Sequence, residues 1–456
     1  MKNSRIQNLV VGTAAAAVAA VGTICHADNP IIQTKFTADP APMVYGNTVF
    51  LYTSHDEDDA VGFKMFNWMC YSTTDMVNWT DHGIIGGVRE PYKTFKWADG
   101  DNAWAAQCIE RHGKFYLYCP FPFKGQMAIG VAVADNPLGP FVDPLGKPLV
   151  VGSYDPTVFI DDDGQAYLYW GGNGPCFHVK LNEDMISTSG GIEVASIDFT
   201  GSPPEASYTE GPWFWKKNQH YYLAWASRCC PEGIGYGMSD SPTGPWKCKG
   251  TIMDPNPMSS GNHPGIIDYK GSSYVFGFNY AVNFAQVPDH RERRSICVGK
   301  MTYNTDGSIA KVPWWSKEGA PQISAFNPYV QTEAATICWE TGIKTQNRGN
   351  GKPGVYVSAN TNGAYIKLKG VDFGRKGAGK FLASVACATK GGAIELRLDG
   401  ETGPLIGTLN VKPTGALDKW ETQSCTVSGA KGVHDLYLKF TGGDGPSLNF
   451  DRWKFE

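Results

Sequence analysis

Short apolar runs separated by turn residues recur along about the first 320 residues of the chain, and they predict β-strands. Residues 155–169 show the unit: the apolar run DPTVF leads through the turn DDDG to the aromatic run AYLY. Two such runs joined by a short turn are typical of a β-hairpin. Equivalent units open at Asp39, Trp104, Asp155, Glu210 and His263.

The spacing of these units predicts a closed ring of sheets. From Trp104 onward they start at intervals of about 50 to 55 residues, and further strand pairs fit between them. A repeat of this length with four strands is typical of a propeller blade, whereas a sandwich requires no regular repeat. We therefore predict an all-β chain in which residues 28–322 form a five-bladed β-propeller.

The residues that open the units are expected to meet in space. The first strand of each propeller blade lines the central channel, so its first residues gather at one mouth. Asp39, Asp155, Glu210 and His263 hold equivalent positions in four of the five units. Acidic residues beside strands are ordinarily turn formers, which is our interpretation of residues 161–163. Three carboxylates in one register predict a functional site instead.

The last part of the chain changes its pattern. The repeat ends within residues 313–328, and alternating strands follow, such as AYIKL at 364–368, AIELRLD at 393–399 and HDLYLKF at 434–440. No helical period accompanies them. We predict that residues 328–456 form a second domain, a β-sandwich of the jelly-roll type.

The N-terminus predicts export. Lys2 and Arg5 precede an apolar stretch at 9–22, and CHA at 25–27 forms a plausible cleavage site, so residues 1–27 read as a signal peptide. The apolar stretch is too short for a permanent membrane anchor. We therefore expect a secreted protein, extracellular or periplasmic, in a compartment that permits disulfides.

Composition limits the classes of molecule that the protein is expected to bind. The net charge is -4 and no long Lys/Arg run occurs, which argues against binding nucleic acid or an anionic membrane surface. The 14 Trp and 21 Tyr residues suit sugar binding through their flat faces, although large β domains also bury such residues in their cores. The 12 cysteines show no metal-binding spacing. We expect a monomer whose partner is a polysaccharide.

Three carboxylates suit glycoside hydrolysis, which needs one protonated and one ionised carboxyl group beside the scissile bond. Asp39 is the candidate general base that activates water, and Glu210 is the candidate general acid. Asp155 would orient and tune Glu210. His263 could bind water or a metal ion, or could be purely structural.

The opening stretches of three units resemble the catalytic segments of glycoside hydrolase family 43, namely ADPAP at 38–42, SYDPTVF at 153–159 and TEGP at 209–212. The resemblance extends over roughly residues 30 to 320. It implies a five-bladed propeller that inverts the anomeric configuration, with no organic cofactor.

The same resemblance implies roles for single residues. It matches Asp39 to the base, Asp155 to the residue that tunes and orients the acid, and Glu210 to the acid. The substrate-binding residues that it implies are His263, Arg294 and Asn279.

The C-terminal segment resembles carbohydrate-binding module family 6 in NPY at 327–329, GVDFG at 370–374 and LNFDRW at 448–453. That resemblance implies a structural calcium ion held by Glu333 and Asp451. The family usually has a further Glu where Ala335 stands, so calcium binding is expected to be weakened.

The leading functional hypothesis is release of α-L-arabinofuranosyl side chains from arabinoxylan. WADGD at 97–101 and the adjacent pair Cys229-Cys230 resemble the arabinoxylan arabinofuranohydrolases of family 43. A β-xylosidase or an arabinanase on the same fold is the alternative within the class. A non-catalytic glycan-binding propeller and a retaining hydrolase acting on fructans are the alternatives outside it.

Overall fold

The structure is a computed structural model that describes residues 25–260, 262–287, 293–349, 354–359, 361–388, 391–442 and 448–456. Most of the predicted signal peptide, residues 1–24, lies outside the described residues. The predicted all-β class is confirmed. The one α-helix of the described residues, α1 (Ala281–Gln286), has 6 residues, and a 3-10 turn, η1 (Pro204–Ala206), precedes β15. No described helix has the length and apolar character needed to cross a membrane.

Five sheets follow one another along the N-terminal part of the described chain, and each contains one predicted hairpin. The first consists of β2 (Phe36–Tyr45), β3 (Thr48–Asp56), β4 (Met65–Thr73) and β5 (Trp79–Gly87), extended by β24 (Thr336–Ile337). The second has β6 (Gln107–Arg111), β7 (Lys114–Phe123), β8 (Gln126–Ala134) and β9 (Val150–Val151). The third has β10 (Thr157–Ile160), β11 (Ala166–Trp170), β12 (Phe177–Leu181) and β13 (Thr188–Val194). The fourth has β15 (Tyr208–Lys217), β16 (His220–Ser227), β17 (Gly233–Ser239), β18 (Trp246–Met253) and β14 (Ile197–Asp198). The fifth has β19 (Gly265–Tyr269), β20 (Ser272–Asn279) and β21 (Ser295–Met301).

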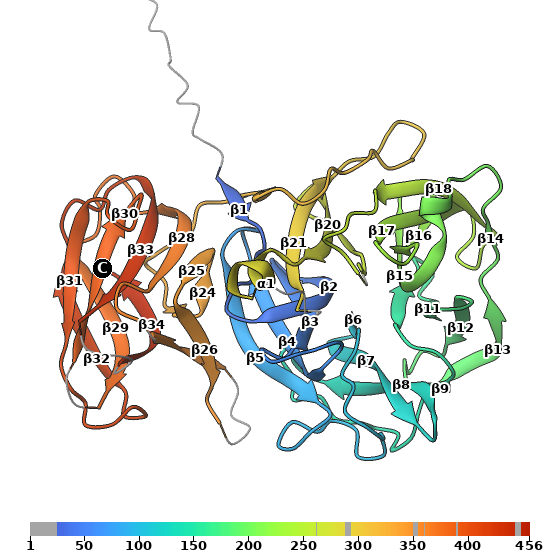
Figure 1. Cartoon of the computed structure of the whole chain (residues 1–456), viewed down its shortest axis with the longest axis horizontal. Coiled ribbons are helices and arrows are strands. Elements are labelled where there is room, and N and C mark those ends of the chain that lie inside the picture. The colour runs from blue at the N-terminus through green and yellow to red at the C-terminus, as the bar shows by residue number, and fades with distance from the viewer. Residues whose placement is uncertain are drawn as a thin grey trace, which may run out of the picture.

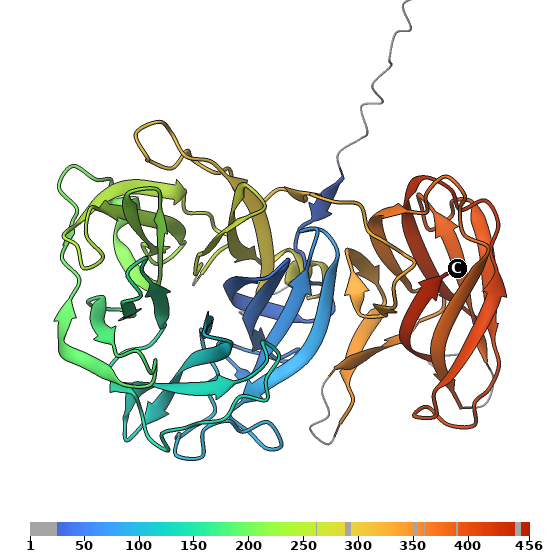
Figure 2. The same cartoon turned by 180° about the vertical axis from the view of Figure 1, so that it is seen from behind.

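The first strands of these sheets contact one another in cyclic order. Strand β2 touches β6, β6 touches β10, β10 touches β15, β15 touches β19, and β19 returns to β2. Figure 1 and the reverse view in Figure 2 show the sheets arranged around this shared middle. The residues that open the five units are therefore brought together, as their register in the sequence predicts.

The fifth sheet differs from the predicted pattern of four strands per unit, since it has three strands among the described residues. Its outer strand β21 bonds instead with a segment from the start of the chain. Ile31 N donates to Ile296 O at 2.8 Å, and Asn29 Nδ2 donates to Val298 O at 3.1 Å. This pairing satisfies the open edge of β21 and covers the last sheet with the first described residues. Nearby, β1 (His26–Asp28) pairs with β22 (Glu318–Pro321).

Two sheets make up the C-terminal part, and one hydrophobic core containing Ile366, Leu396 and Phe450 draws on both. One sheet contains β26 (Ile343–Asn347), β27 (Val355–Ala359), β34 (Leu448–Phe455), β29 (Lys380–Cys387) and β32 (Glu421–Thr426), with β23 (Thr332–Glu333) paired to β34. The other contains β25 (Trp339–Thr341), β28 (Tyr365–Asp372), β33 (Val433–Thr441), β30 (Gly392–Leu398) and β31 (Leu405–Val411). The predicted strands of this segment are confirmed, and the two sheets form a sandwich-like arrangement.

Polar contacts and strand pairing join the two parts. Asp28 accepts hydrogen bonds from Lys369 Nζ at 2.6 Å and from Lys367 Nζ at 3.0 Å. Lys369 N also donates to Asn78 Oδ1 at 2.9 Å. Strand β24 leaves the C-terminal segment to pair with β5 of the first sheet. These contacts hold the C-terminal sheets beside the first and fifth sheets, as Figure 1 shows.

Candidate active site

A pocket of about 130 Å³ opens where the first strands of the ring meet. Its lining consists of Asp39, Phe63, Met65, Trp104, Ala105, Tyr154, Asp155, Asn173, Glu210, His263 and Arg294. The three predicted catalytic carboxylates thus lie in one pocket together with two of the three predicted substrate-binding residues.

Irregular backbone positions the three carboxylates. The pairing of β2 with β3 shifts register between Ala38 and Ala41, and β15 shifts register on both sides of Glu210. Asp39 and Asp155 adopt positive φ angles of 53° and 60°, which is uncommon for residues other than glycine. Such interruptions turn a side chain out of the regular alternation of a strand, and they are frequent next to functional sites.

His263 lies between the three carboxylates. Its Nδ1 is 3.5 Å from Asp39 Oδ1, and its Nε2 is 3.6 Å from Asp155 Oδ2 and 3.3 Å from Glu210 Oε1. Burial by itself would lower the pKa of His263, but the negative charges of Asp155 and Asp39 and the hydrogen bond to Glu210 raise it to about 10. A protonated imidazole therefore neutralises part of the negative charge in the pocket.

Opposing effects act on the pKa of Asp155. Burial raises its pKa well above the usual range, His263 opposes this rise, and the charges of Glu210 and Asp39 add to it. Glu210 is the most exposed of the three side chains, at 17% against 3% for Asp39 and 4% for Asp155. Glu210 is thus placed where it can reach a ligand that enters the pocket.

Arg294 and Ser54 hold the Asp39 carboxylate in place. Its Nη1 donates to Asp39 Oδ1 at 3.0 Å, while Nε and Nη2 form a fork on the two oxygens of Asp56 at 3.0 and 2.9 Å. Ser54 Oγ donates to the other oxygen of Asp39 at 2.5 Å. Both oxygens of Asp39 are therefore held in place, and the Asp56 fork orients the guanidinium.

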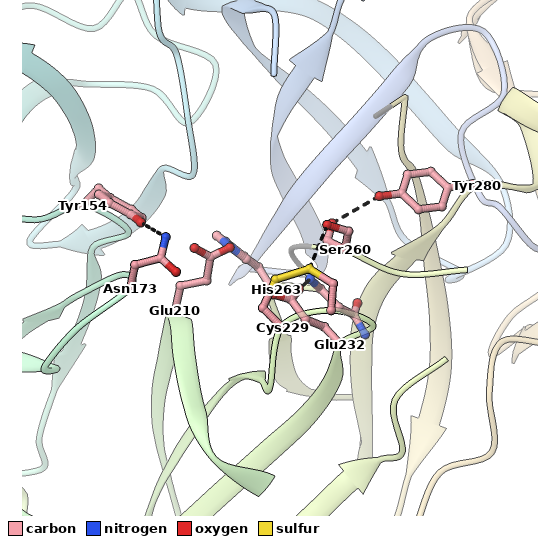
Figure 3. Close-up of a disulfide and its surroundings, with 10 residues drawn as sticks. Tyr154, Asn173, Glu210, Cys229, Glu232, Ser260, His263 and Tyr280 are labelled. Carbon is pink, nitrogen blue, oxygen red and sulfur yellow. Dashed lines mark hydrogen bonds and ion pairs between the residues drawn. A yellow bond between two sulfur atoms is a disulfide. The ribbon is translucent and has the colours of Figure 1, made fainter. Parts of the chain in front are cut away.

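Several residues of the site were missed by the sequence prediction. Tyr154 and Asn173 line the pocket, and Asn173 Nδ2 donates to the Tyr154 hydroxyl at 2.7 Å (Figure 3). Trp104 opens the second unit, so the register argument used for the carboxylates could have identified it. Asp56 carries no such signal, because it ends β3 and does not open a unit. The structure buries its side chain fully.

One predicted substrate-binding residue lies outside this pocket. Asn279 ends β20, and its Oδ1 accepts a hydrogen bond from Ala281 N at 3.0 Å. Its side chain lines a separate cavity between the two parts of the molecule. The structure therefore brings His263 and Arg294 to the carboxylates but does not bring Asn279 there.

A disulfide between adjacent residues lies near the pocket. Cys229 and Cys230 follow β16, in which Ala226 pairs with Glu210 across the sheet. Cys230 Sγ is 3.5 Å from Ser260 Oγ. Figure 3 draws this disulfide and its contact with Ser260 in one view with the Glu210 and His263 side chains.

The loop after this disulfide supports His263. The buried Glu232 accepts a hydrogen bond at 2.6 Å from the backbone N–H of Asn262, the residue before His263. On the other side, Gly211 has a φ of 60°, and a Cβ there would lie 2.7 Å from His263 Cγ. Gly211 N also donates to Asp155 Oδ2 at 3.2 Å. A glycine at this position lets the backbone approach both the imidazole and a carboxylate.

Asp155, Glu210 and His263 also offer ligand atoms within 4.8 Å of one another, but a metal ion could bind there only if His263 lost its proton, because an imidazolium cannot be a metal ligand. The predicted calcium site of the C-terminal part fits less well. Asp451 is buried and bonds to the Arg348 guanidinium, so a cationic side chain already occupies its carboxylate. With a methyl group at Ala335, these residues do not supply the six or more oxygen ligands that calcium requires.

We expect removal of calcium to leave the C-terminal part intact. Chelation with EDTA should leave the melting temperature unchanged. Arg348→Ala should lower the free energy of unfolding by about 1 to 3 kcal/mol, because it leaves the buried Asp451 with only the half-exposed Arg452, 3.6 Å away, as a charged partner. Differential scanning calorimetry measures both effects. A calcium-dependent rise in melting temperature that disappears in Asp451→Asn would contradict this prediction.

Asp56 is expected to act as a positioning residue for Arg294. Asp56→Asn removes one charge from a buried ion pair, which should cost about 3 to 5 kcal/mol of stability. It should also lower kcat/KM at least about tenfold, since a misplaced guanidinium loosens Asp39. Steady-state kinetics and thermal unfolding check both effects, with the exposed Asp59→Asn as the matched control. A stability loss with unchanged kcat and KM would assign Asp56 a structural role only.

Comparison with known proteins agrees with this site. Residues 27–309 match the profile of the glycosyl hydrolases family 43, and residues 333–456 match that of the carbohydrate binding module family 6. The chain is 36% identical to an arabinoxylan arabinofuranohydrolase of Paenibacillus polymyxa, over 94% of this chain and 74% of the relative. It is 34% identical to an arabinoxylan arabinofuranohydrolase of Bacillus subtilis, over 94% and 92% of the two chains.

Solved structures agree with the sequence comparisons. The crystal structure of a family 43 arabinoxylan arabinofuranohydrolase from Bacillus subtilis, in complex with cellotetraose, has a TM-score of 0.83 at 33% identity and covers 94% of this chain and 97% of that one. A family 43 β-xylosidase/α-arabinofuranosidase from a compost metagenome, in a calcium-free form with xylotriose, has a TM-score of 0.58 at 28% identity and covers 64% and 99%. The chain belongs to family 43 of the glycosyl hydrolases and carries a family 6 carbohydrate-binding module.

Proposed function

We propose that this protein is an inverting glycoside hydrolase that releases α-L-arabinofuranosyl side chains from arabinoxylan. The observation that carries the proposal is a narrow pocket in which three carboxylates surround one histidine. At about 130 Å³ the pocket is much smaller than the roughly 300–1,000 Å³ of sites for larger ligands, so it suits a single pentose. The arabinoxylan arabinofuranohydrolases named above support this substrate.

Glu210, Asp39 and Asp155 have different roles in the proposed reaction. Glu210, the most exposed carboxyl group, protonates the leaving oxygen of the xylose unit, and Asp39 removes a proton from the attacking water. The His263 ring lies between these two carboxylates, which contact opposite ring nitrogens. In inverting enzymes the acid and the base stand about 6.5–9.5 Å apart, which leaves room for the attacking water. Asp155 orients the pair through His263 and Gly211.

The finer description of the fold belongs to the same proposal. We infer that the five sheets whose first strands form the contact ring are the blades of a five-bladed β-propeller of residues 28–322. Residues 328–456 would form the jelly-roll module. Export and cleavage of residues 1–27, with secretion of the enzyme, are proposed from the sequence alone.

The test is to incubate the purified protein with arabinoxylan and to follow the released sugar and its anomeric proton by NMR. Arabinose released with inverted configuration, and absent with Asp39→Asn, supports the proposal. Asp163→Asn, in an exposed hairpin turn, is the matched control and should act as the wild type does. Xylose or oligosaccharide release would instead assign a xylosidase or arabinanase, and no release with retained binding would leave a glycan-binding protein.

A further inference from the structure

A second cavity lies between the ring of sheets and the C-terminal part, and it is larger than the catalytic pocket. Its volume is about 820 Å³, within the range of sites for extended ligands. Helix α1 and the segment around Trp314 form one wall, and strands β25, β28 and β33 form the other. Figure 1 shows α1 between the two parts of the molecule. We call this cavity the interdomain groove.

Aromatic side chains from both parts face the groove. Trp314 comes from the segment after the fifth sheet, and Trp339, Tyr365 and Tyr437 come from the C-terminal sheet. All four side chains are partly exposed, although Trp314 also packs against a hydrophobic core and Lys367 Nζ lies 5.8 Å from the centre of the Tyr437 ring. The Tyr365 and Tyr437 rings are neighbours, with centroids 5.4 Å apart and planes tilted by 49°. Partly exposed rings of this kind stack on the apolar faces of sugars.

The charged side chains that line the groove carry equal numbers of positive and negative charges. Asp28 pairs with Lys367 at 3.0 Å, and Glu340 and Lys317 contribute one further charge of each sign. Such a lining attracts neither a polyanion nor a polycation. It offers hydrogen bonds beside aromatic faces, the combination that a neutral, hydroxyl-rich polymer requires.

The groove is a close neighbour of the catalytic pocket. Asn279 lines the groove, and in the fifth sheet it pairs directly with Ser295. Ser295 follows Arg294, which lines the catalytic pocket. Asn279 therefore reaches the groove, while the residue next to its strand partner reaches the catalytic pocket.

We propose that the interdomain groove is a second glycan-binding site, which holds an unbranched stretch of β-1,4-linked xylan while a neighbouring side chain enters the catalytic pocket. The proposal rests on the proposed function for the identity of the polymer. The groove would raise the local concentration of arabinoxylan at the pocket without taking part in bond cleavage. Both parts of the chain are needed for it, since each supplies aromatic rings.

The test measures retention of the full chain in affinity electrophoresis through gels that contain debranched xylan, from which arabinose has been removed. The variants are Trp339→Ala and Trp314→Ala, one from each wall, and Trp420→Ala is the control because it lies on the C-terminal part but does not line the groove. Each groove variant should lower the affinity about fivefold or more, as removal of a stacked aromatic anchor does. Activity on an aryl α-L-arabinofuranoside should stay within about twofold, because that substrate needs only the catalytic pocket.

Wild-type affinity in both groove variants, or loss of affinity in Trp420→Ala alone, would overturn the groove assignment. If one variant fails to fold, as its aryl-substrate activity and melting temperature reveal, the other variant tests the opposite wall independently. The two proposals can fail separately. Xylan retention that depends on Trp339 without arabinose release would retain the groove and refute the enzyme function, and the reverse result would refute the groove alone.

Discussion

Glu210→Gln is expected to lower kcat on arabinoxylan about a thousandfold, the scale of a lost general acid. The carboxamide keeps the size of the side chain and its place beside His263 Nε2, but it cannot deliver a proton to the leaving xylose oxygen. Initial rates of arabinose release measure the loss. The KM should change little, because substrate contacts in the rest of the pocket remain.

Substrates with different leaving groups distinguish the general acid from the general base. An aryl arabinofuranoside with a strongly acidic phenol needs little protonation, so Glu210→Gln should retain much of its activity on that substrate. Asp39→Asn should lose activity on both substrates, because water must be activated in either case. Equal losses for Glu210→Gln on both substrates would contradict its assignment as the acid and would favour a positioning role.

His263→Gln is expected to have the second largest effect. It removes the cation that lies 3.3 to 3.6 Å from all three carboxylates, so only Arg294, beside Asp39, still offsets their mutual repulsion. Breaking a buried charge pair in this way costs about 3 to 5 kcal/mol of stability. The displaced carboxylates should also lower kcat/KM at least about a hundredfold. Chemical denaturation and steady-state kinetics measure the two losses, with EDTA present so that no bound cation replaces the imidazole.

The stability effect of His263 should depend on pH in a defined direction. The pKa is about 10 in the folded protein and 6.5 for an ordinary histidine, so folding favours the protonated form. The stabilisation is complete below about pH 6.5 and is lost as the pH rises through about 10. The stability difference between wild type and His263→Gln should therefore narrow between these values. If this stability difference instead grows with pH over the same range, His263 is not a protonated imidazole that the carboxylates stabilise. His220→Gln, at a half-exposed position outside the pocket, is the matched control.

Local patterns in the sequence determined the strands and the candidate carboxylates. A strand and its turn are encoded by neighbouring residues, so the hairpin of β10 and β11 could be predicted from residues 155–169 alone. Because the same unit recurs, Asp155 and Glu210 could be placed in one register and expected at one pocket. The C-terminal strands followed from the same alternation.

Contacts between residues far apart in the chain were decided only by the tertiary structure. The Asp56 fork on Arg294 and the pairing of Arg348 with Asp451 depend on how strands separated by more than a hundred residues meet. The Asn279 side chain lies in the groove and not in the catalytic pocket, because the chain enters α1 directly after this residue. The groove itself exists only once the two parts are docked. Periodicity reports which face of a strand is buried, but not which distant surface buries it, and that choice depends on the packing of the whole chain.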